Sequence, residues 1–471
     1  MNTKVGFFMK MKRRFYNLIS ILFVLALWQF SAFLIKSPLI FPSFTRVFCR
    51  LVQLCGNSLF WCSVLYSSLR VFAGFLIATA AGLFAGTLCG LFPAVRAFLE
   101  FPLALLRSVP VVSFILLAIF VFDSDFVPVF STVLMGFPVI TTATASAFTF
   151  STEERNLFFM AEVFRLTRAQ KIRCVFLPHF EPFFKSGVFS VFGMSWKVTA
   201  AAEVLCVPKN ALGAFMQNAQ VHLESADVLA TTLVLVLLAF LFEKMLALAL
   251  DLLFARLTRL PQKSRQKPLQ KIDLSPCSVI LKNLTIEKGG RTLFENFNFE
   301  FESLRTTAIL APSGSGKTTL LNYIASTQKN VSFLFQEPRL LPSLTVFENV
   351  LLPLTNVYDR QTAATIAEKY LKLTNLLPRK NELCTHLSGG EKQRVAMARA
   401  FAFPSQILLL DEAFQSLDFA LKHELELTLK NLLQQTPRTA ILVTHEKEEA
   451  QALADKIVEL AGEPLKINAE V

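Results

Sequence analysis

Charged residues are scarce in this sequence, at 17% of 471 residues, whereas hydrophobic residues reach 53% and phenylalanine alone contributes 48. So few charges exclude a disordered chain, and a mean hydropathy of +0.49 excludes an ordinary soluble protein. Basic residues exceed acidic residues by 12. In so apolar a chain, we interpret this excess as basic loops at the cytoplasmic face of a lipid bilayer and not as a nucleic-acid surface.

Cysteine pairs at metal-ligand spacing are also missing. The eight cysteines are scattered without a CxxC pair, and the five histidines are equally dispersed. This pattern excludes a disulfide framework and a zinc site of the usual spacing, so we interpret the cysteines as small buried hydrophobic residues.

Long apolar runs fill the first 255 positions and then stop. A helix needs about 20 apolar residues to cross a bilayer. We therefore predict an all-α transmembrane domain with six spans, at 18–35, 71–92, 103–122, 127–148, 183–205 and 228–252. The apolar stretches 58–69 and 98–107 leave that count open by one.

Basic residues are placed asymmetrically around these spans. They cluster before the first span and between the fourth and fifth, at Lys10, Lys12, Arg13, Arg14, Arg155, Arg165, Arg168, Lys171 and Arg173. The connections at 123–125 and 209–227 carry few basic residues. The positive-inside bias then places both ends of the membrane domain in the cytoplasm. A cleaved signal peptide is the competing interpretation of the first 35 residues, but no clear small-x-small cleavage site follows them.

Two features inside the spans are notable. Small residues recur every four positions in the second span, at Gly74, Ala78, Gly82, Gly86 and Gly90, which predicts a seam for close helix packing. Glu203 lies near the end of the fifth span. A carboxylate at membrane depth needs a partner or water, although Glu203 could also lie at the membrane interface.

The composition changes near residue 260, which predicts three parts: a transmembrane permease domain at 1–260, a basic, proline-containing linker at 261–276, and a second domain at 277–471. The second domain has short apolar runs at 307–310, 331–335, 407–410 and 440–443, separated by helix-like stretches. This alternation predicts an α/β fold with a largely parallel sheet.

A phosphate-binding loop follows the strand predicted at 307–310. Glycines let successive N–H groups surround phosphates at a helix N-terminus, a lysine neutralises the β and γ charges, and a hydroxyl binds Mg²⁺. The predicted nucleotide-binding residues are Ser313, Gly314, Ser315, Gly316, Lys317, Thr318 and Thr319. Ala311 stands where the first glycine is usual, which reduces backbone freedom.

Asp411 and Glu412 follow four apolar residues at the end of the strand predicted at 407–410. Acids at the end of a buried strand beside a phosphate loop can hold Mg²⁺ through water and activate the attacking water. We assign Asp411 to the metal and Glu412 to the water as general base.

The run LSGGEKQR at 387–394 lies between the phosphate loop and these acids. From about Cys277 to the C-terminus the sequence resembles the ATP-binding-cassette (ABC) ATPases, in the α/β P-loop fold. The resemblance also includes Gln336, Ser416-Leu417-Asp418 and Thr444-His445.

The ABC resemblance implies the roles of further residues. The signature residues Ser388, Gly389, Gly390 and Glu391 of one subunit would cap the ATP held by another. Gln336 would touch ATP and Mg²⁺, and His445 would contact the γ-phosphate. The catalytic set is then Glu412, His445 and Lys317, and the Mg²⁺ set is Thr318, Gln336 and Asp411.

Four departures from the family pattern accompany this resemblance. Lys288 or Gly289 occupies the position of the adenine-stacking aromatic, and Ala413 that of a proline after the acids. Ala311, in place of the usual first glycine of the phosphate loop, is a third departure. The stretch 318–335 is shorter than usual, which predicts that a small β-hairpin is missing. Because no catalytic group is lost, we still expect hydrolysis.

The membrane half also resembles a known family. The stretch 160–178 looks like the coupling loop of binding-protein-dependent import permeases, with Ala161 and Pro178 in place and Arg165 where a glycine is customary. Matches at 107–110, 136–138, 202–203 and 211–213 look like the nitrate, sulfonate and taurine permeases, a family that includes transporters of thiamine precursors. A solvated basic loop is the alternative interpretation of 160–178.

Together these resemblances imply an importer of a small organic solute or oxyanion in the cytoplasmic membrane. One permease and one ATPase make half a transporter, so we expect a homodimer with two ATP sites, served by a separate extracytoplasmic solute-binding protein. An exporter, or an ATP-switched regulatory membrane protein without cargo, is the alternative. The sequence displays no cluster of pathway cations that would indicate an anionic cargo.

Overall fold

The computed structural model describes all residues except 1, 38, 260–274, 413, 415–418 and 471. It divides into two compact units. The first comprises Met1–Thr149 and Phe180–Phe254, and the second comprises Phe150–His179 and Ala255–Val471. The segment between Phe150 and His179 therefore folds with the C-terminal unit, although the chain enters it from the membrane domain and returns there. The predicted linker at 261–276 lies almost wholly outside the described residues.

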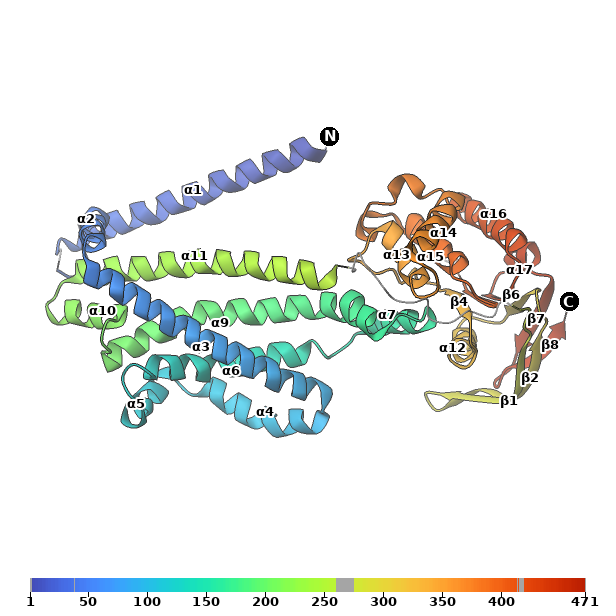
Figure 1. Ribbon diagram of the computed structural model, residues 1–471, viewed down its shortest axis with the longest axis horizontal. Helices are drawn as coiled ribbons and strands as arrows, with labels where there is room; N and C mark the ends of the chain where they lie inside the picture. Colours follow the sequence, from blue (N-terminus) through green and yellow to red (C-terminus); the bar gives the residue numbers. More distant parts are fainter. Residues whose placement is uncertain (1, 38, 260–274, 413, 415–418, 471) are drawn as a thin grey trace. The chain divides into compact units, whose positions relative to one another are not determined.

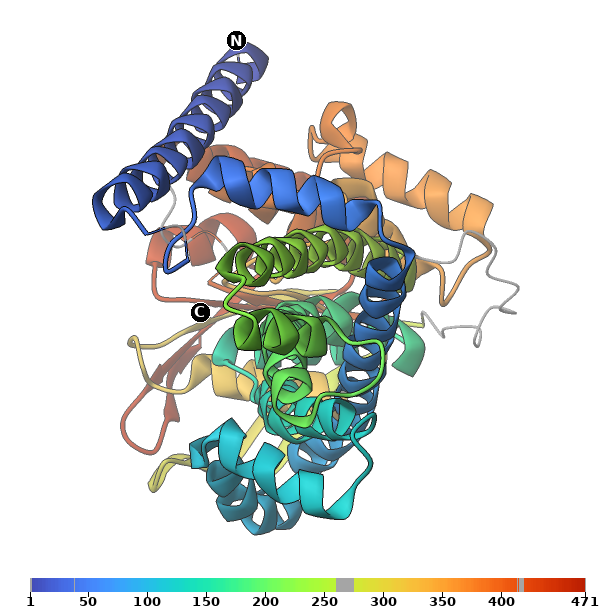
Figure 2. The same cartoon turned by 90° about the vertical axis from the view of Figure 1, so that its left-hand side faces the viewer.

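The first unit is helical. Its helices are α1 (Asn2–Ile35), α2 (Phe44–Cys55), α3 (Ser58–Leu91), α4 (Pro93–Ser108), α5 (Val111–Val121), α6 (Val127–Ser146), most of α9 (Leu177–Cys206), α10 (Leu212–Val221) and α11 (Ser225–Thr258). In Figure 1 and Figure 2, α1 (dark blue) projects from the other helices of this unit. Buried aromatic and aliphatic side chains join α3, α6, α9 and α11, including Phe75, Ile140, Phe192 and Trp196.

Four helical segments in the described part of the chain are long and apolar enough to cross a bilayer: Ser58–Leu91, Val127–Ser146, Arg168–Cys206 and Ser225–Thr258. These correspond to four of the six predicted spans. The first predicted span contains a shorter apolar helix at Ile19–Ile35, and the third corresponds to the pair α4 and α5. The count is thus four, or five if that pair is one span.

The span predicted at 103–122 is not one straight helix. Helices α4 and α5 meet at an angle of 96°. Val109 has extended backbone angles (φ −76°, ψ 133°) and Pro110 follows it. Because the ring of a proline disfavours the helical conformation of the preceding residue, α4 ends there and the chain changes direction.

The predicted glycine seam is confirmed as a packing surface between α3 and α6. A Cβ on Gly74 would lie 2.7 Å from Cβ of Thr132, and one on Gly82 would lie 2.6 Å from Cβ of Ile140. Gly86 faces Thr144 in the same way. Only glycine, whose side chain is a single hydrogen atom, allows the two backbones to approach this closely.

Glu203 is fully buried and has partners. Its carboxylate accepts hydrogen bonds from Ser67 Oγ (2.7 Å), Arg70 Nη1 (3.0 Å) and the N–H of Gly213 (3.1 Å). Arg70 also pairs with Asp125 at 2.6 Å. These bonds compensate the burial of the charges and join α3, α9 and the start of α10.

The second unit is an α/β fold around a six-stranded sheet in the order β4-β5-β6-β3-β7-β8. The strands are β3 (Thr306–Leu310), β4 (Val331–Leu334), β5 (Ile407–Asp411), β6 (Thr439–Thr444), β7 (Lys456–Ala461) and β8 (Lys466–Glu470). All neighbouring pairs are parallel except β7 and β8. A separate antiparallel hairpin is formed by β1 (Val279–Lys288) and β2 (Arg291–Phe301). The four strands predicted from apolar runs are confirmed.

The helices and short helical turns of this unit are α7 (Thr152–Val163), α8 (Arg168–Lys171), η1 (Ile172–Phe176), α12 (Lys317–Thr327), α13 (Val346–Leu354), α14 (Arg360–Leu373), η2 (Leu377–Arg379), η3 (Cys384–His386), α15 (Gly389–Ala402), α16 (Phe419–Gln435) and α17 (Lys447–Leu453). Alternating strand residues face two cores: Ile309 lies in one, and Ala308 and Leu310 lie in the other. Figure 1 shows α13 to α17 gathered together, apart from α12 and the β1–β2 hairpin.

We predict that Gly82→Ala destabilises the membrane unit by about 1–3 kcal/mol, because the added methyl group overpacks the contact between α3 and α6. The matched control is Gly193→Ala on α9, where an added Cβ meets no atom within 4 Å. Denaturant unfolding of the purified chain in detergent measures both. Equal stabilities of the two variants would contradict the close approach.

Candidate functional site

The phosphate loop connects β3 to α12, as its sequence requires. Gly314 (φ 78°) and Gly316 (φ 102°) adopt left-handed backbone conformations that side chains rarely tolerate. Ser315 Oγ is buried in this loop without a hydrogen-bond partner. A glycine-containing loop at a helix N-terminus, with a buried hydroxyl that lacks a partner, suits phosphate oxygens.

Lys317 is buried at the start of α12, with its side chain 4% exposed. Its Nζ donates to the carbonyl oxygens of Ala311 (2.8 Å) and Pro312 (2.9 Å) and lies 3.2 Å from Oε1 of Glu412. These three partners use the three donors of the ammonium group. A phosphate oxygen that binds Lys317 must therefore displace one of them.

The two acids lie where the sequence places them, at the end of β5. Thr318 Oγ1 donates to Oδ1 of Asp411 at 3.0 Å. Glu412 has φ of +39°, an uncommon conformation for a residue with a side chain, and its N–H donates to the carbonyl of Val443 at 3.0 Å. Its Oε1 also lies 3.7 Å from Nδ1 of His445. The structure thus brings Lys317, Thr318, Asp411, Glu412 and His445 together.

Asp411 is 2% exposed, and this burial raises the pKa of its carboxyl group to about 6. The hydrogen bond from Thr318 and the charges of Arg339 and Lys317 oppose the rise, whereas the charge of Glu412 adds to it. A hydroxyl and a carboxylate are ligands that Mg²⁺ prefers, so the pair fits that ion, which would neutralise phosphate charge. Gln336, the third predicted Mg²⁺ residue, is exposed after β4.

The signature residues form the N-terminus of α15. Ser388 caps this helix through a capping box with Glu391: Ser388 N–H and Oγ donate to Oε2 of Glu391 at 2.9 and 2.8 Å. These bonds and the guanidinium of Arg379 lower the pKa of Glu391 to about 2. A Cβ on Gly389 would meet no atom within 4 Å. The face around Gly389 is therefore open.

The predicted coupling segment docks within the second unit. Asn356, 5% exposed and just after α13, exchanges two hydrogen bonds of 3.0 Å with the amide of Gln170. Its Nδ2 also donates to the carbonyl of Arg165 at 3.1 Å. Buried apolar side chains of the segment, including Ala161, Phe164 and Val175, join the core on one face of the sheet.

Arg165 has φ of +54°. This left-handed conformation gives a physical reason for the glycine that is customary there, since glycine adopts it without strain. Ala161 is fully buried, and its carbonyl accepts from the N–H of Leu166 at 2.8 Å. Pro178 is the second residue of α9, which follows η1 without a break.

A buried arginine connects this segment to the residues that follow Gln336. Arg399, in the last turn of α15, lies with its guanidinium carbon 4.9 Å from the ring centroid of Phe164. It donates to the carbonyls of Pro338 and Arg339 at 2.9 Å. The ring of Phe164 also packs edge-to-face on Phe403, with centroids 5.4 Å apart. One helix therefore carries the signature at its start and touches the coupling segment near its end.

The structure shows two of the positions at which the sequence departs from the ABC family pattern. Lys288 ends β1, and its Nζ donates to Thr319 Oγ1 at 3.3 Å, so a lysine and not an aromatic ring lies beside the start of α12. The stretch 318–335 contains α12 followed by β4, without the small hairpin. Ala413 and the run 416–418 lie outside the described residues.

Sequence reasoning missed several of these residues. Arg70, Asn356 and Arg399 become informative only through partners far away in the chain, and no local pattern marks them. Gln170 had a local signal, because Thr167 and Gln170 form a capping box that starts α8.

Two family models match the chain. Residues 294–415 match the ABC transporter family, and residues 78–259 match the family described as the inner membrane component of binding-protein-dependent transport systems. The second match includes the segment from Phe150 to His179 that folds with the C-terminal unit.

Among curated proteins, the chain is similar to the sulfate/thiosulfate import ATP-binding protein CysA 2 of Shewanella oneidensis, at 38% identity over 208 residues, covering 38% of this chain and 58% of the relative. It is 35% identical over 207 residues to CysA of Escherichia coli K12, covering 38% and 57%. The chain thus spans a little over half the length of these relatives. A dimeric ATP-binding cassette solved with ADP and Pi is 28% identical, with a TM-score of 0.37, and covers 41% of this chain and 98% of that one.

We predict that Asp411→Asn raises the melting temperature of the protein without Mg²⁺ or nucleotide by roughly 2–4 °C at pH 8. The folded-state pKa of about 6 lies above the ordinary aspartic-acid value of 3.8, so the ionised carboxylate destabilises the fold above pH 6. The destabilisation weakens as pH falls through 6 and is absent below 3.8. Thermal unfolding at pH 8 and pH 5 measures this, and a gain no larger at pH 8 than at pH 5 would contradict it.

Proposed function

We propose, from the premise that this chain joins a binding-protein-dependent inner-membrane transport component to an ABC transporter ATPase domain, that it is half of an ATP-driven importer. Two copies would form the complete transporter in the cytoplasmic membrane, with the ATPase domains in the cytoplasm. A separate extracytoplasmic protein would deliver the solute.

The observation that carries this proposal is the docked segment between Phe150 and His179. It belongs to the stretch that matches the inner-membrane component, yet Gln170 and Phe164 are held by the ATPase unit. An ATPase without a transport or signalling task has no need to build part of its core from a membrane domain. The alternative of a solvated basic loop is disfavoured because Phe164 and Ala161 are fully buried.

ATP hydrolysis is proposed to proceed at the phosphate loop. Lys317 and the loop N–H groups would bind the phosphates and orient them, while Thr318, and Asp411 through water, would hold Mg²⁺, whose charge would neutralise that of the phosphates. Glu412, at the end of β5, would take the proton of the attacking water, and His445, whose Nδ1 lies 3.7 Å from Oε1 of Glu412, would contact the terminal phosphate. Gln336 would complete the ATP and Mg²⁺ contacts.

The second half of each ATP site is proposed to come from the partner copy. Ser388 and Gly389 lie on an open helix N-terminus, whose positive end favours a phosphate. Closure of two ATPase domains over ATP would press on this end of α15. Because Arg399 in the same helix contacts Phe164, the displacement would reach the segment that leads into the membrane domain.

The proposed cargo is a small organic solute or oxyanion of the nitrate, sulfonate, taurine or thiamine-precursor type. The membrane-domain motifs support this class, and the names of the ATPase relatives specify import of sulfate and thiosulfate by those proteins.

We predict that Glu412→Gln lowers ATP hydrolysis at least 100-fold, because it removes the general base, and abolishes solute accumulation. Proteoliposomes with ATP on the ATPase side, a candidate binding protein on the other, and labelled taurine, ethanesulfonate, nitrate and a thiamine-precursor pyrimidine measure both rates. The matched control is Glu300→Gln, an exposed glutamate on β2. Accumulation that survives in Glu412→Gln would contradict the proposal, and ATP-driven movement only in the opposite direction would replace import by export.

A further inference from the structure

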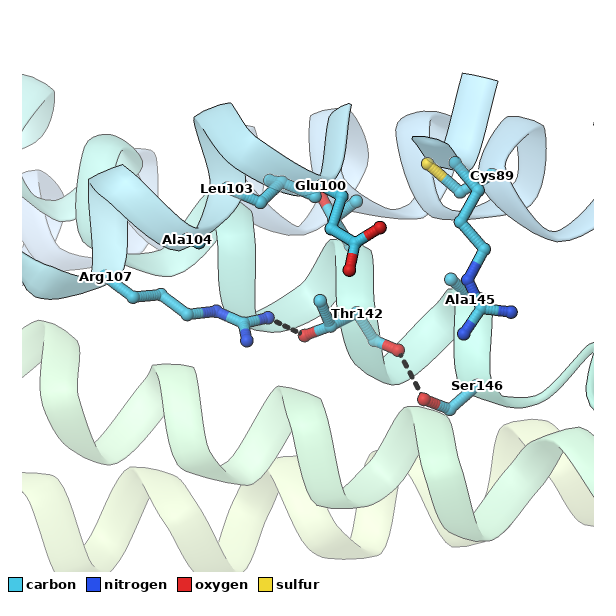
Figure 3. A pocket seen from close by; sticks show the side chains of 10 residues that line it. Cys89, Glu100, Leu103, Ala104, Arg107, Thr142, Ala145 and Ser146 are labelled. Atoms are coloured by element: carbon cyan, nitrogen blue, oxygen red, sulfur yellow. Dashed lines mark hydrogen bonds between the residues drawn. The ribbon is translucent and has the colours of Figure 1, made fainter. Parts of the chain in front are cut away.

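The cavity between α4 and α6, of about 310 Å³, carries charged side chains but indicates no ligand. Arg107 Nη2 donates to the carbonyl of Pro138 at 3.0 Å and to Oγ1 of Thr142 (Figure 3). Arg96, Glu100 and Arg107 are all exposed, so their charges need no further partner. A more informative charge lies beside the phosphate loop, on the β1–β2 hairpin.

The β1–β2 hairpin packs directly on the phosphate loop. A Cβ on Gly316 would lie 2.9 Å from Cδ1 of Leu293, on β2. Leu293 packs against the core on one face of the sheet, and its carbonyl accepts from the N–H of Leu465 at 2.9 Å. The hairpin is therefore held as a wall along one side of the loop that the proposed function assigns to the phosphates.

Lys288 ends β1 and extends from this wall to the end of the phosphate loop. Its Nζ donates to Oγ1 of Thr319 at 3.3 Å. The next two residues, Gly289 and Gly290, form the turn of the hairpin with φ of 61° and 77° and add no side chain there. An ammonium group thus lies beside the loop at the first turn of α12.

The aromatic rings of the hairpin are directed elsewhere. The structure describes the hairpin from end to end, and its rings are those of Phe294, Phe297, Phe299 and Phe301. Three of them are buried in the core on one face of the sheet, and Phe299 packs against the same core. Proteins that bind bases without reading them by hydrogen bonds commonly stack each base on an aromatic ring. The hairpin offers a bound nucleotide a cation and no ring.

The first three residues of α12 point in different directions, because consecutive helical residues are about 100° apart. Lys317 Nζ lies 3.2 Å from Glu412. Thr318 donates to Asp411, whereas Thr319 accepts from the hairpin lysine. The proposed function puts the terminal phosphate at Glu412. Phosphates bound along the loop would then lead away from Glu412 toward Thr319, so the hairpin lysine would meet the innermost phosphate.

We propose that Lys288 binds the α-phosphate of a bound nucleotide, and that the site accepts nucleoside triphosphates irrespective of their base. The inference rests on the proposed function and widens its nucleotide substrate from ATP to this class. Every nucleoside triphosphate carries the same phosphates, so a lysine contact adds affinity without selecting adenine. The chain should therefore hydrolyse GTP and CTP as well as ATP.

The test is isothermal titration calorimetry of the purified full-length chain in lipid nanodiscs, with EDTA present so that no Mg²⁺-dependent hydrolysis occurs. The probes are ATP, GTP and CTP. We expect three dissociation constants within fivefold of one another. A preference for ATP of more than fivefold over either of the other nucleotides would overturn the inference.

Lys288→Ala should weaken the binding of all three nucleotides by the same factor, at least threefold, since contacts of exposed charges are individually weak. The matched control is Lys282→Ala, an exposed lysine on the same strand, which should leave the three affinities unchanged. A loss in Lys288→Ala that is smaller than threefold, or confined to one nucleotide, would contradict the assignment of the α-phosphate to this lysine.

Tyr323 offers the rival platform for a base. It is 39% exposed and follows Thr319 by one turn of α12. Because the inference assigns the base no stacking partner, Tyr323→Leu should change each dissociation constant less than threefold. A larger loss would place the base on this ring and overturn base-independent recognition.

Hydrolysis with Mg²⁺ distinguishes failure of this inference from failure of the proposed function. Turnover of GTP and CTP within fivefold of ATP turnover supports both. Turnover of ATP alone removes the base-independent site and leaves the import proposal. Equal binding of the three nucleotides without hydrolysis of any of them removes the ATP-driven function and leaves the binding assignment.

Discussion

The burial of Phe164 and the amide pair of Gln170 and Asn356 are the contacts on which the proposed coupling depends. Both ends of the segment from Phe150 to His179 continue into the membrane unit, so a force on the docked segment is carried by covalent chain in two directions. Its buried side chains are part of the same core as the strands that lead to the phosphate loop. Undocking of the segment from the ATPase unit would therefore expose apolar surface. The free-energy cost would be several kcal/mol for side chains as large as Phe164.

A displacement of the docked segment moves the membrane helices only if the membrane unit moves as a rigid body and does not deform locally. The close contact of α3 with α6 at Gly74, Gly82 and Gly86 leaves no free volume at that interface. The buried pair of Arg70 and Glu203 fastens α3 to α9, the helix that leaves the coupling segment. Closely packed elements respond by discrete shifts and not by gradual deformation, which suits a transporter with two access states.

The sequence predicted the features that local chemistry determines. The phosphate loop, the apolar strands and the acids after β5 each require particular residues at fixed spacing, and the structure places them as expected. The bend between α4 and α5 had a signal in Pro110, but the apolar composition on both sides outweighed it in the prediction of a continuous span.

Other features depend on tertiary packing and left no local trace. The partners of Glu203 and the exchange of hydrogen bonds between Gln170 and Asn356 join side chains from elements that are far apart in the sequence. In the same way, composition alone divided the chain near residue 260, whereas the fold assigns the segment from Phe150 to His179 to the C-terminal unit.

The most direct measurement of the central claim is cross-linking of Gln170→Cys to Asn356→Cys in a background without the eight native cysteines, with a short thiol-specific reagent and mass spectrometry of the linked peptides. Because the two amides are 3.0 Å apart, the account predicts rapid cross-linking within one chain and ATP-driven uptake that survives it, since the segment stays docked. The control pair replaces Asn356→Cys by Gln434→Cys, on the exposed side of α16. Cross-linking no faster than in the control pair would contradict the account.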